Sequence, residues 1–465
     1  MPRPDARPRG ANPRRHALEI VSAALAGRAF VQDQVDALAR SGRLSKPDLG
    51  LAAEIAYTTV RRLATLDAVL APLSSRPLED LQPALLNILR CAACQLLFLD
   101  RIPAHAAVDE AVRLARSTGH GRASGFINAV LRQLTRSVSR GAQPAGPATR
   151  RLPLASGQWL VFTYDVLPTE ADAAARLAAV HSFPPWLAAR WLGRYGAAET
   201  ERLFALANTP APACLRPNAG LLTPRELLQL LRKEGVEASL SQSGRTARLA
   251  PHTRVQDLGV FQAGLAQPQD DSAAAVALFA NPQPGQAVLD LCAAPGGKTT
   301  HLLELAPGAR VTAVDLTAQK LRMVEENVRR LGLPAPELVH AEGEAFCKAH
   351  PDAFDTVLLD APCSNSGVLR RRPEARWRLT AAAIRELAAL QGRLLRAALA
   401  AVKPGGSVVY ATCSIEPEEN QELVRACARE TGAALEDEKA ILPTEEGDGA
   451  YMARLRRAAG PGGVA

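Results

Sequence analysis

The spacing of apolar residues divides the 465-residue chain into regions of different pattern. From about residue 16 to residue 136, apolar positions recur every three or four residues, which is the period of an amphipathic helix. Breaks fall at clusters of Gly, Pro and Ser. This first region is therefore predicted to be helical throughout. The helices expected there cover residues 18–25, 51–63, 81–99, 108–114 and 123–134.

The pattern changes after residue 136. Residues 137–175 are predicted to be a linker, because they begin with the stretch SVSRGAQPAGPATRRLPLA, which has linker composition. Residues 176–279 mix helical patterns at 185–195 and 224–234 with short extended pieces. That mixture predicts a small α+β domain.

Residues 280–457 alternate short apolar runs with helical patterns. Repeated alternation of strand and helix predicts a Rossmann-like α/β domain with a doubly wound, mostly parallel sheet. The strands expected there are residues 287–291, 310–314, 337–340, 356–360 and 407–412.

Charge adds little to this division. Lys and Arg outnumber Asp and Glu by 55 to 47, and the net charge of +8 points only weakly to a polyanionic partner. Residues 1–15 hold several arginines and prolines and are predicted to be a disordered basic arm, with a tail at 458–465. An arm that touches RNA is the alternative for residues 1–15.

Neither a membrane span nor an export signal is expected. There is no run of about 18 apolar residues, and Glu19 interrupts the apolar stretch that starts at Ala17. The eight cysteines lack disulfide-like spacing, which is typical of a protein of the reducing cytoplasm. The tight pair Cys91 and Cys94 lies in an apolar segment without a second pair or a histidine cluster, so core packing is favoured over a metal site.

Two cysteines stand where predicted strands end. Cys363 follows the apolar run 356–359 within Asp360-Ala361-Pro362-Cys363-Ser364, and Cys413 follows the run 407–410 within Ala411-Thr412-Cys413-Ser414. Ligands of open parallel sheets bind at the carboxyl ends of the strands. Two thiols at such ends indicate thiol chemistry in one cleft, but their positions do not tell which of them attacks.

A glycine-rich turn follows the first strand of the same domain. It comprises Cys292, Ala293, Ala294, Pro295, Gly296, Gly297 and Lys298. A phosphate loop is excluded because position 292 is not glycine. Asp315 ends the next strand, where it can accept hydrogen bonds from ribose hydroxyls. The turn therefore predicts a nucleoside-type cofactor, and a plain glycine turn with a surface aspartate is the alternative.

These motifs resemble a known family. The runs DLCAAPGGKTT (290–300), LLDAPCSNSGVLRRRPEARW (358–377) and YATCSIEPEEN (410–420) resemble the Sun/Nop family of RNA cytosine-5 methyltransferases. Residues 16–136 resemble a NusB-like RNA-binding domain, and the segment around Arg216-Pro217-Asn218 resembles the family's RNA-recognition segment. The resemblance implies S-adenosylmethionine as cofactor and small-subunit (16S) ribosomal RNA, rather than DNA, as partner.

The resemblance also implies roles for single residues. Cys413 would attack carbon 6 of cytosine, Cys363 would assist loss of the carbon 5 proton, and Asp360 would stabilise the base during addition. Residues 292–298, Asp315, Asp360 and Glu342 would contact the cofactor. Two positions depart from the family: Glu342 replaces an aspartate, and Ala450 replaces an aromatic residue for which Tyr451 would have to compensate.

RNA contacts are expected mainly from arginines, because aromatic residues make up only 4% of the chain. The candidates are Arg216, Asn218, Arg370, Arg371 and Arg372. A solvated charged surface is the alternative for the arginine triplet, and Trp377 is expected to pack rather than stack on a base. Transfer RNA as substrate, and a non-catalytic assembly factor, remain alternatives for the function. A monomer is expected.

Overall fold

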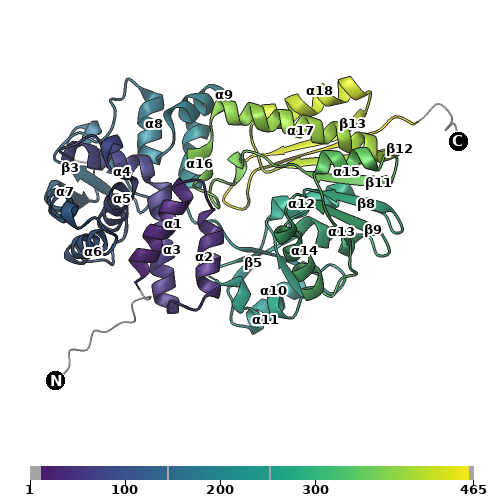
Figure 1. Cartoon of the computed structure of the whole chain (residues 1–465), viewed down its shortest axis with the longest axis horizontal. Helices are drawn as coiled ribbons and strands as arrows, with labels where there is room; N and C mark the ends of the chain where they lie inside the picture. The colour runs from purple at the N-terminus through teal and green to yellow at the C-terminus, as the bar shows by residue number, and fades with distance from the viewer. Residues whose placement is uncertain (1–11, 144–145, 251–252, 460–465) are drawn as a thin grey trace. The chain divides into compact units, whose positions relative to one another are not determined.

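The computed structural model describes residues 12–143, 146–250 and 253–459 (Figure 1). Most of the predicted basic arm and most of the tail lie outside these described residues. The chain divides into two compact units: the first comprises Met1–Thr209 with Arg371–Arg378, and the second comprises Pro210–Arg370 with Leu379–Ala465. Residues 176–209 thus belong with the N-terminal region, whereas their pattern had grouped them with the segment up to residue 279.

The first unit begins with a helical bundle, which confirms the expectation of helices only for the described residues of 16–136. Its central helix α5 (Pro83–Phe98) packs against α1, α3, α4, α6 and α7. Cys91 and Cys94 of α5 are buried in that core, as expected. The other helices are α1 (Pro13–Leu25), α2 (Val31–Arg40), α3 (Lys46–Arg61), α4 (Leu63–Leu70), α6 (Ala104–Ser117) and α7 (Ser124–Ser137).

The stretch predicted to be a linker instead carries a small sheet. Strands β1 (Val138–Gly141), β3 (Trp159–Phe162) and β2 (Arg151–Pro153) pair antiparallel in that order. Leu152, Leu160 and Phe162 are buried in the core of the helical bundle. Helices α8 (Ala173–His181) and α9 (Pro185–Ala207) complete the N-terminal part of the first unit.

The segment Arg371–Arg378 joins the first unit from far along the chain, and its last four residues form the short helix α16 (Ala375–Arg378). Arg376 is fully buried and donates to the Ser182 and Ala207 carbonyls and the Asn208 amide oxygen at 2.9–3.2 Å. Trp377 packs on the bundle core and donates from Nε1 to the Val60 carbonyl at 2.8 Å. The expectation that Trp377 packs is therefore confirmed.

The second unit opens with a small α+β region. Strands β5 (Ala238–Leu240), β6 (Ala247–Leu249), β4 (Cys214–Pro217) and β7 (Ala266–Pro268) form an antiparallel sheet in that order. Helices α10 (Pro224–Lys233) and α11 (Gly259–Gln262) contribute to its core through Leu227, Leu231 and Val260.

A seven-stranded sheet organises the rest of the second unit, in the order β10-β9-β8-β11-β12-β14-β13. The first five strands in this order run parallel, and β14 pairs antiparallel with both neighbours. The predicted parallel strands are confirmed as β8 (Ala287–Leu291), β9 (Arg310–Asp315), β10 (Glu337–His340), β11 (Phe354–Asp360) and β12 (Val402–Thr412). The sequence analysis did not single out β13 (Ala434–Ile441) and β14 (Ala450–Arg456).

Alternating side chains of the central strands face two different helical layers. Leu289, Val357 and Tyr410 pack on one face with α15 (Gly343–Ala349), α17 (Ala381–Ala401) and α18 (Gln421–Thr431). Val288, Leu358 and Val409 pack on the other face with α12 (Asp271–Ala280), α13 (Gly297–Leu305) and α14 (Ala318–Arg330). Burial on both faces explains why these strands are continuous apolar runs. Among the described residues, no helix is long and apolar enough to cross a membrane.

Candidate active site

The order of strands places a ligand crevice at β8 and β11. The chain runs from β8 outward to β9 and β10, then returns to the other side of β8 as β11. At such a switch point the loops after neighbouring strands diverge, and ligands bind outside the carboxyl ends of the strands. The loop after β8 is the glycine-rich turn, and the loop after β11 contains Cys363.

The glycine-rich turn packs so closely against α14 that position 296 has no room for a side chain. Gly296 has a φ of 96°, and a Cβ added there would lie 3.0 Å from Cα of Val324 in α14. The Asn327 side chain of α14 donates to the Pro295 carbonyl at 3.0 Å. Helix α13 starts at Gly297, so its first backbone N–H groups point toward the turn. The turn is therefore packed closely against α14, with the N-terminus of α13 beside it.

Asp315 is oriented by the backbone around that turn. One carboxylate oxygen accepts from the Ala294 N–H at 3.2 Å, and the other accepts from the Thr317 N–H at 3.1 Å. A carboxylate oxygen has further lone pairs, so both remain able to accept from a ligand hydroxyl. An acid at the end of β9 beside backbone donors at the N-terminus of α13 is an arrangement that would suit the nucleoside-type cofactor expected from the sequence.

The two cysteines that follow predicted strands have their thiols in contact. Cys363 follows β11 and Cys413 follows β12, and their sulfur atoms lie 3.2 Å apart. Asn365 adds a second contact, because its side-chain oxygen lies 3.4 Å from the Cys413 sulfur and its amide donates to the Cys363 carbonyl. The hydrogen bond to Cys413, together with burial, raises the pKa of Cys363 well above its ordinary value. The pair therefore carries at most one negative charge near neutral pH.

Lys298 and Asp360 form an ion pair beside these thiols. Lys298 Nζ donates to Asp360 Oδ2 at 2.6 Å, and both side chains are partly exposed. Burial lowers the pKa of Lys298, but the charge and the hydrogen bond of Asp360 raise it by more, so the ammonium keeps its charge. The Cys413 thiol also raises the pKa of Lys298. The ion pair thus places a fixed cation near Cys413.

Asp290 is a buried carboxyl group that the sequence analysis did not select. It is the fourth residue of β8, it has no exposed surface, and Thr299 of α13 donates to its Oδ2 at 2.6 Å. Burial raises the pKa of Asp290 to about 7. Its position in a strand that is otherwise apolar, two residues before Cys292, was the signal available in the sequence.

The two departures from the family pattern have different surroundings. Glu342 follows β10 and caps α15, accepting from the Ala345 N–H at 3.0 Å, so the longer side chain is used at the helix N-terminus. Ala450 is buried at the start of β14, and the neighbouring Tyr451 packs edge-on against Tyr410 with ring centroids 6.4 Å apart. Tyr451 thus fills the sheet interior next to the Cys413 strand.

The candidates for RNA contact need a correction. Arg216 and Asn218 are each 3% exposed. Arg216 pairs with Glu304 and donates to Gln269, and Asn218 donates to the backbone carbonyls of Gly264 and Leu331. Their polar groups serve the packing of the second unit and present no surface to RNA, because a buried guanidinium must be paired within the protein.

The arginine triplet is divided between the two units. Arg370 donates to the Glu445 carbonyl within the second unit at 3.1 Å. Arg371 and Arg372 belong to the first unit, where the Arg372 guanidinium lies 4.2 Å from the centroid of the Phe30 ring. All three side chains are partly exposed. RNA contact through them therefore stays a prediction.

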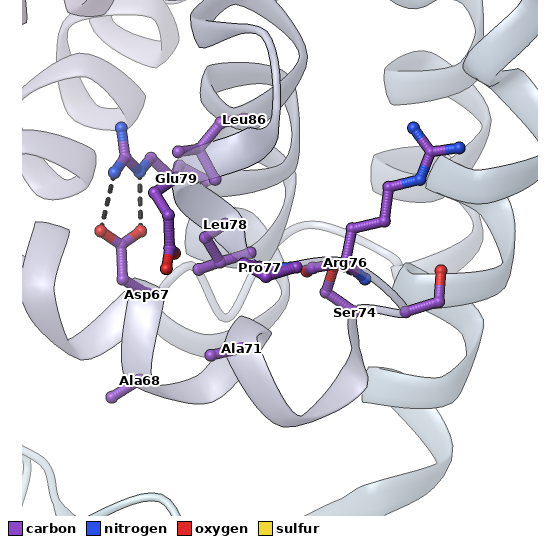
Figure 2. Close-up of a pocket in the computed structure, with 11 residues that line it drawn as sticks. Asp67, Ala68, Ala71, Ser74, Arg76, Pro77, Leu78, Glu79 and Leu86 are labelled. Atoms are coloured by element: carbon purple, nitrogen blue, oxygen red, sulfur yellow. Dashed lines mark hydrogen bonds and ion pairs between the residues drawn. The ribbon is translucent and has the colours of Figure 1, made fainter.

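A pocket of about 640 Å³ lies in the first unit, around the turn before α5. Figure 2 shows Asp67 held by two parallel hydrogen bonds, each 2.7 Å long, which come from Arg90. Glu79 and Arg76 also line the pocket. It contains no thiol and no glycine-rich turn, so it offers none of the chemistry found at the carboxyl ends of β8, β11 and β12.

Comparison with known proteins matches three regions of the chain. The profile described as "16S rRNA methyltransferase RsmB/F" matches residues 277–456. The NusB family matches residues 11–136, and a ferredoxin-like domain described as "Methyltr_RsmF/B-like" matches residues 183–255.

Relatives match along most of their length. The ribosomal RNA small subunit methyltransferase B of Serratia proteamaculans (strain 568) is 36% identical over 423 residues, covering 89% of this chain and 91% of that protein. The probable ribosomal RNA small subunit methyltransferase B of Bacillus subtilis (strain 168) is 32% identical, covering 89% and 87%.

Among solved structures, PH0851 superimposes with a TM-score of 0.76 over 96% of this chain and 99% of its own, at 24% identity. A methyltransferase homolog protein from Pyrococcus horikoshii gives 0.55 at 26% identity, covering 62% and 100%. The fold class expected from the sequence is thereby confirmed.

Proposed function

Because the chain belongs to the RsmB/F family of 16S rRNA methyltransferases, we propose that it methylates carbon 5 of a cytosine in small-subunit ribosomal RNA, with S-adenosylmethionine as methyl donor. The observation that carries the proposal is the pair of thiols 3.2 Å apart, next to the ion pair of Lys298 and Asp360. Carbon 5 and carbon 6 of cytosine are bonded neighbours, so two adjacent sulfur atoms suit a reaction that needs a group at each.

Cys413 is the nucleophile of this proposal. Its thiolate forms a bond to carbon 6, and the electron pair of the carbon 5–carbon 6 double bond moves into the ring and makes carbon 5 nucleophilic. A proton taken up from solvent by the ring nitrogen neutralises the charge that develops, and Asp360 accepts hydrogen bonds from that N–H and from the amino group. Lys298 orients Asp360 through their hydrogen bond.

The turn at residues 292–298, with Asp315 and Glu342, would hold the cofactor. When bound, S-adenosylmethionine supplies the methyl group that carbon 5 accepts. Cys363 then assists removal of the carbon 5 proton; the electron pair left behind restores the double bond as the bond between Cys413 and carbon 6 breaks. The protein thereby returns to its starting state, with both thiols free.

Trapping the covalent adduct tests the proposal. The full-length protein and S-adenosylmethionine are incubated with 16S RNA that contains 5-fluorocytosine, whose carbon 5 substituent cannot leave, and adducts are resolved on denaturing gels. We expect an adduct with the wild type and with Cys427→Ala, which removes a buried thiol of α18, and none with Cys413→Ala. No adduct with 16S RNA, together with adducts on transfer RNA, would overturn the substrate, and no adduct with either RNA would overturn the mechanism.

The second thiol has a distinct signature. We expect Cys363→Ala to form the adduct on ordinary RNA and to retain it, because the proton at carbon 5 is not removed and elimination is blocked. The same gels, run with unmodified 16S RNA, measure the accumulation. If Cys413→Ala accumulates adducts and Cys363→Ala forms none, the two roles are exchanged.

A further inference from the structure

A buried carboxylate lies behind both cysteine loops. Glu419 ends the short 3-10 helix Pro417–Glu419, between β12 and α18, and has no exposed surface. Both Ser364, which follows Cys363, and Ser414, which follows Cys413, donate from their hydroxyls to the same oxygen, Oε2. The Ser364 backbone N–H donates to the other oxygen, Oε1, at 2.8 Å. One side chain therefore holds the residue after each thiol.

Gln391 of α17 extends this cluster to the other side of Cys363. Its side-chain amide donates to Glu419 Oε1 at 2.9 Å and to the Pro362 carbonyl at 2.8 Å. The residues on both sides of Cys363, Pro362 and Ser364, are thus held by hydrogen bonds of this cluster. The backbone of Glu419 is also held in place, because the Tyr410 hydroxyl donates to the Glu419 carbonyl at 2.6 Å.

The bonds match what an ionised carboxylate needs. A carboxylate only accepts, and burial is costly unless its lone pairs are occupied. Two hydroxyls, one backbone N–H and one amide point at Glu419, and hydrogen bonds to a charged acceptor are stronger and shorter than neutral ones. The two serine hydroxyls lie 3.1 Å apart because they share one oxygen. The shared acceptor therefore sets how far apart the two loops can lie.

We propose that Glu419 is a positioning residue that fixes the spacing of the Cys363 and Cys413 thiols, acting through Ser364 and Ser414. Glu419 is buried behind the loops, so it contacts neither base nor cofactor. The reaction needs one sulfur at carbon 6 and the other beside carbon 5, and a misplacement of about 1 Å of a reacting group costs on the order of a hundredfold in rate. The significance of this spacing for catalysis rests on the proposed function.

The first experiment measures the spacing without any reaction on RNA. Phenylarsine oxide bridges two neighbouring thiols by forming two arsenic–sulfur bonds with release of water, and peptide mass spectrometry identifies the bridged pair. We expect rapid bridging of Cys363 and Cys413 in the wild-type protein and at least about tenfold slower bridging in Glu419→Gln. In that variant an amino group replaces one of the two acceptor oxygens, each of which accepts two hydrogen bonds in the wild type.

Matched variants separate spacing from stability. Glu304→Gln alters another buried carboxylate of the second unit, which pairs with Arg216, and Ser241→Ala removes another buried serine–carboxylate bond, to Asp271. Both should bridge at the wild-type rate even where they lower the melting temperature. Ser414→Ala should bridge more slowly, and it keeps the test available if Glu419→Gln does not fold.

The second experiment joins the spacing to catalysis. In single turnovers on 5-fluorocytosine RNA, Glu419→Gln should slow adduct formation at least about tenfold and leave the S-adenosylmethionine dissociation constant within about twofold of the wild type. Wild-type rates of bridging and of adduct formation in a folded Glu419→Gln would overturn the inference. If bridging depends on Glu419 while the wild type forms no adduct on any RNA, the proposed function fails and the spacing role stands.

Discussion

Asp290 combines complete burial with one hydrogen bond, from Thr299, and its second oxygen has no hydrogen-bond partner in the structure. Burial disfavours the charged form, which is why the pKa of Asp290 rises to about 7. The carboxyl group therefore titrates near neutral pH, directly behind the glycine-rich turn. A group whose pKa is higher in the folded chain than in the unfolded chain stabilises the fold most at low pH.

Asp290→Asn should remove this pH dependence. In the wild type, the stabilising contribution is fully present below about pH 4, the unfolded value, and is lost as the pH rises to about 7. The rise of the Asp290 pKa from its ordinary value to about 7 corresponds to roughly 4 kcal/mol in the free energy of unfolding. Urea unfolding from pH 4 to pH 8 should show the variant gaining stability relative to the wild type across this interval, with no further change above it. A constant difference at all pH values would contradict this expectation.

The ion pair of Lys298 and Asp360 is the second residue-scale feature with a direct test. Lys298→Met should leave Asp360 without its cation and the thiol pair without a nearby positive charge, so we expect adduct formation to fall by at least about a hundredfold at pH 7. Adduct rates on 5-fluorocytosine RNA at pH 7 measure this. Lys403→Met, which breaks a comparable pair with Asp355, serves as control.

Three loops meet at one glycine between the elements of the second unit. The Gly367 N–H donates to the Cys413 carbonyl at 2.9 Å, and the Gly449 N–H donates to the Gly367 carbonyl at 2.9 Å. A Cβ added to Gly367 would lie 2.7 Å from the Cys413 carbonyl oxygen and 2.8 Å from the Gly449 carbonyl oxygen. At Gly367, the loops after β11 and β12 and the segment before β14 therefore touch through backbone atoms.

Gly367→Ala should separate these loops. Because both contacts are to backbone atoms, relief requires movement of the Cys413 loop, and we expect a stability loss of about 1–3 kcal/mol with a much larger fractional loss of methyl transfer. Gly220→Ala, where the added Cβ would have only an ordinary contact of 3.8 Å, should change neither. Thermal unfolding and transfer of labelled methyl to 16S RNA measure the two effects. Normal activity with reduced stability would show that the loop contact does not matter for the reaction.

An element could be predicted where its own residues form an apolar run, and it was missed where its burial depends on partners that are distant in sequence. Strands β8 and β11 and the second half of β12 are buried on both faces, so each is an apolar run, and the cysteines that follow β11 and β12 were placed correctly from the sequence. Strand β13 is largely exposed and highly charged, and β1 holds no fully buried residue, so neither shows an apolar run. Asp290 and Glu419 escaped selection because their importance depends on burial and on partners such as Gln391 and Ser364 that are distant in sequence.

At the scale of the molecule, the two units are not consecutive in the chain. The segment Arg371–Arg378 leaves the second unit seven residues after Ser364 and completes the first unit. Its Glu374 carboxylate accepts from the Val31 N–H at the start of α2 at 2.9 Å, and Arg378 donates to the Ala24 and Ala29 carbonyls. The acid caps the N-terminus of α2, whose own N-cap residue, Phe30, makes no side-chain hydrogen bond, and the guanidinium adds a donor to carbonyls at and after the end of α1.

Trp377→Ala should therefore destabilise a part of the chain that lies hundreds of residues earlier. Loss of the packed indole and of its hydrogen bond to Val60 should cost about 2–4 kcal/mol in the first unit. Hydrogen exchange followed by mass spectrometry should show faster exchange in α1 to α4, with β8, β11 and β12 unchanged. Arg385→Ala, at an exposed position of α17, should alter neither region. Faster exchange confined to the second unit would contradict the assignment of the segment.

The first unit cannot be completed until the segment Arg371–Arg378 has been translated. When residue 209 leaves the ribosome, the bonds from Glu374, Arg376 and Trp377 to the N-terminal helices cannot yet form, because 161 residues lie between position 209 and position 371. At the usual 5–20 residues per second, this interval lasts roughly 10 to 30 s. The N-terminal helices must therefore persist as an incomplete intermediate while the glycine-rich turn and the Cys363 loop are made, and the chain closes its first unit only after most of its active site has been translated.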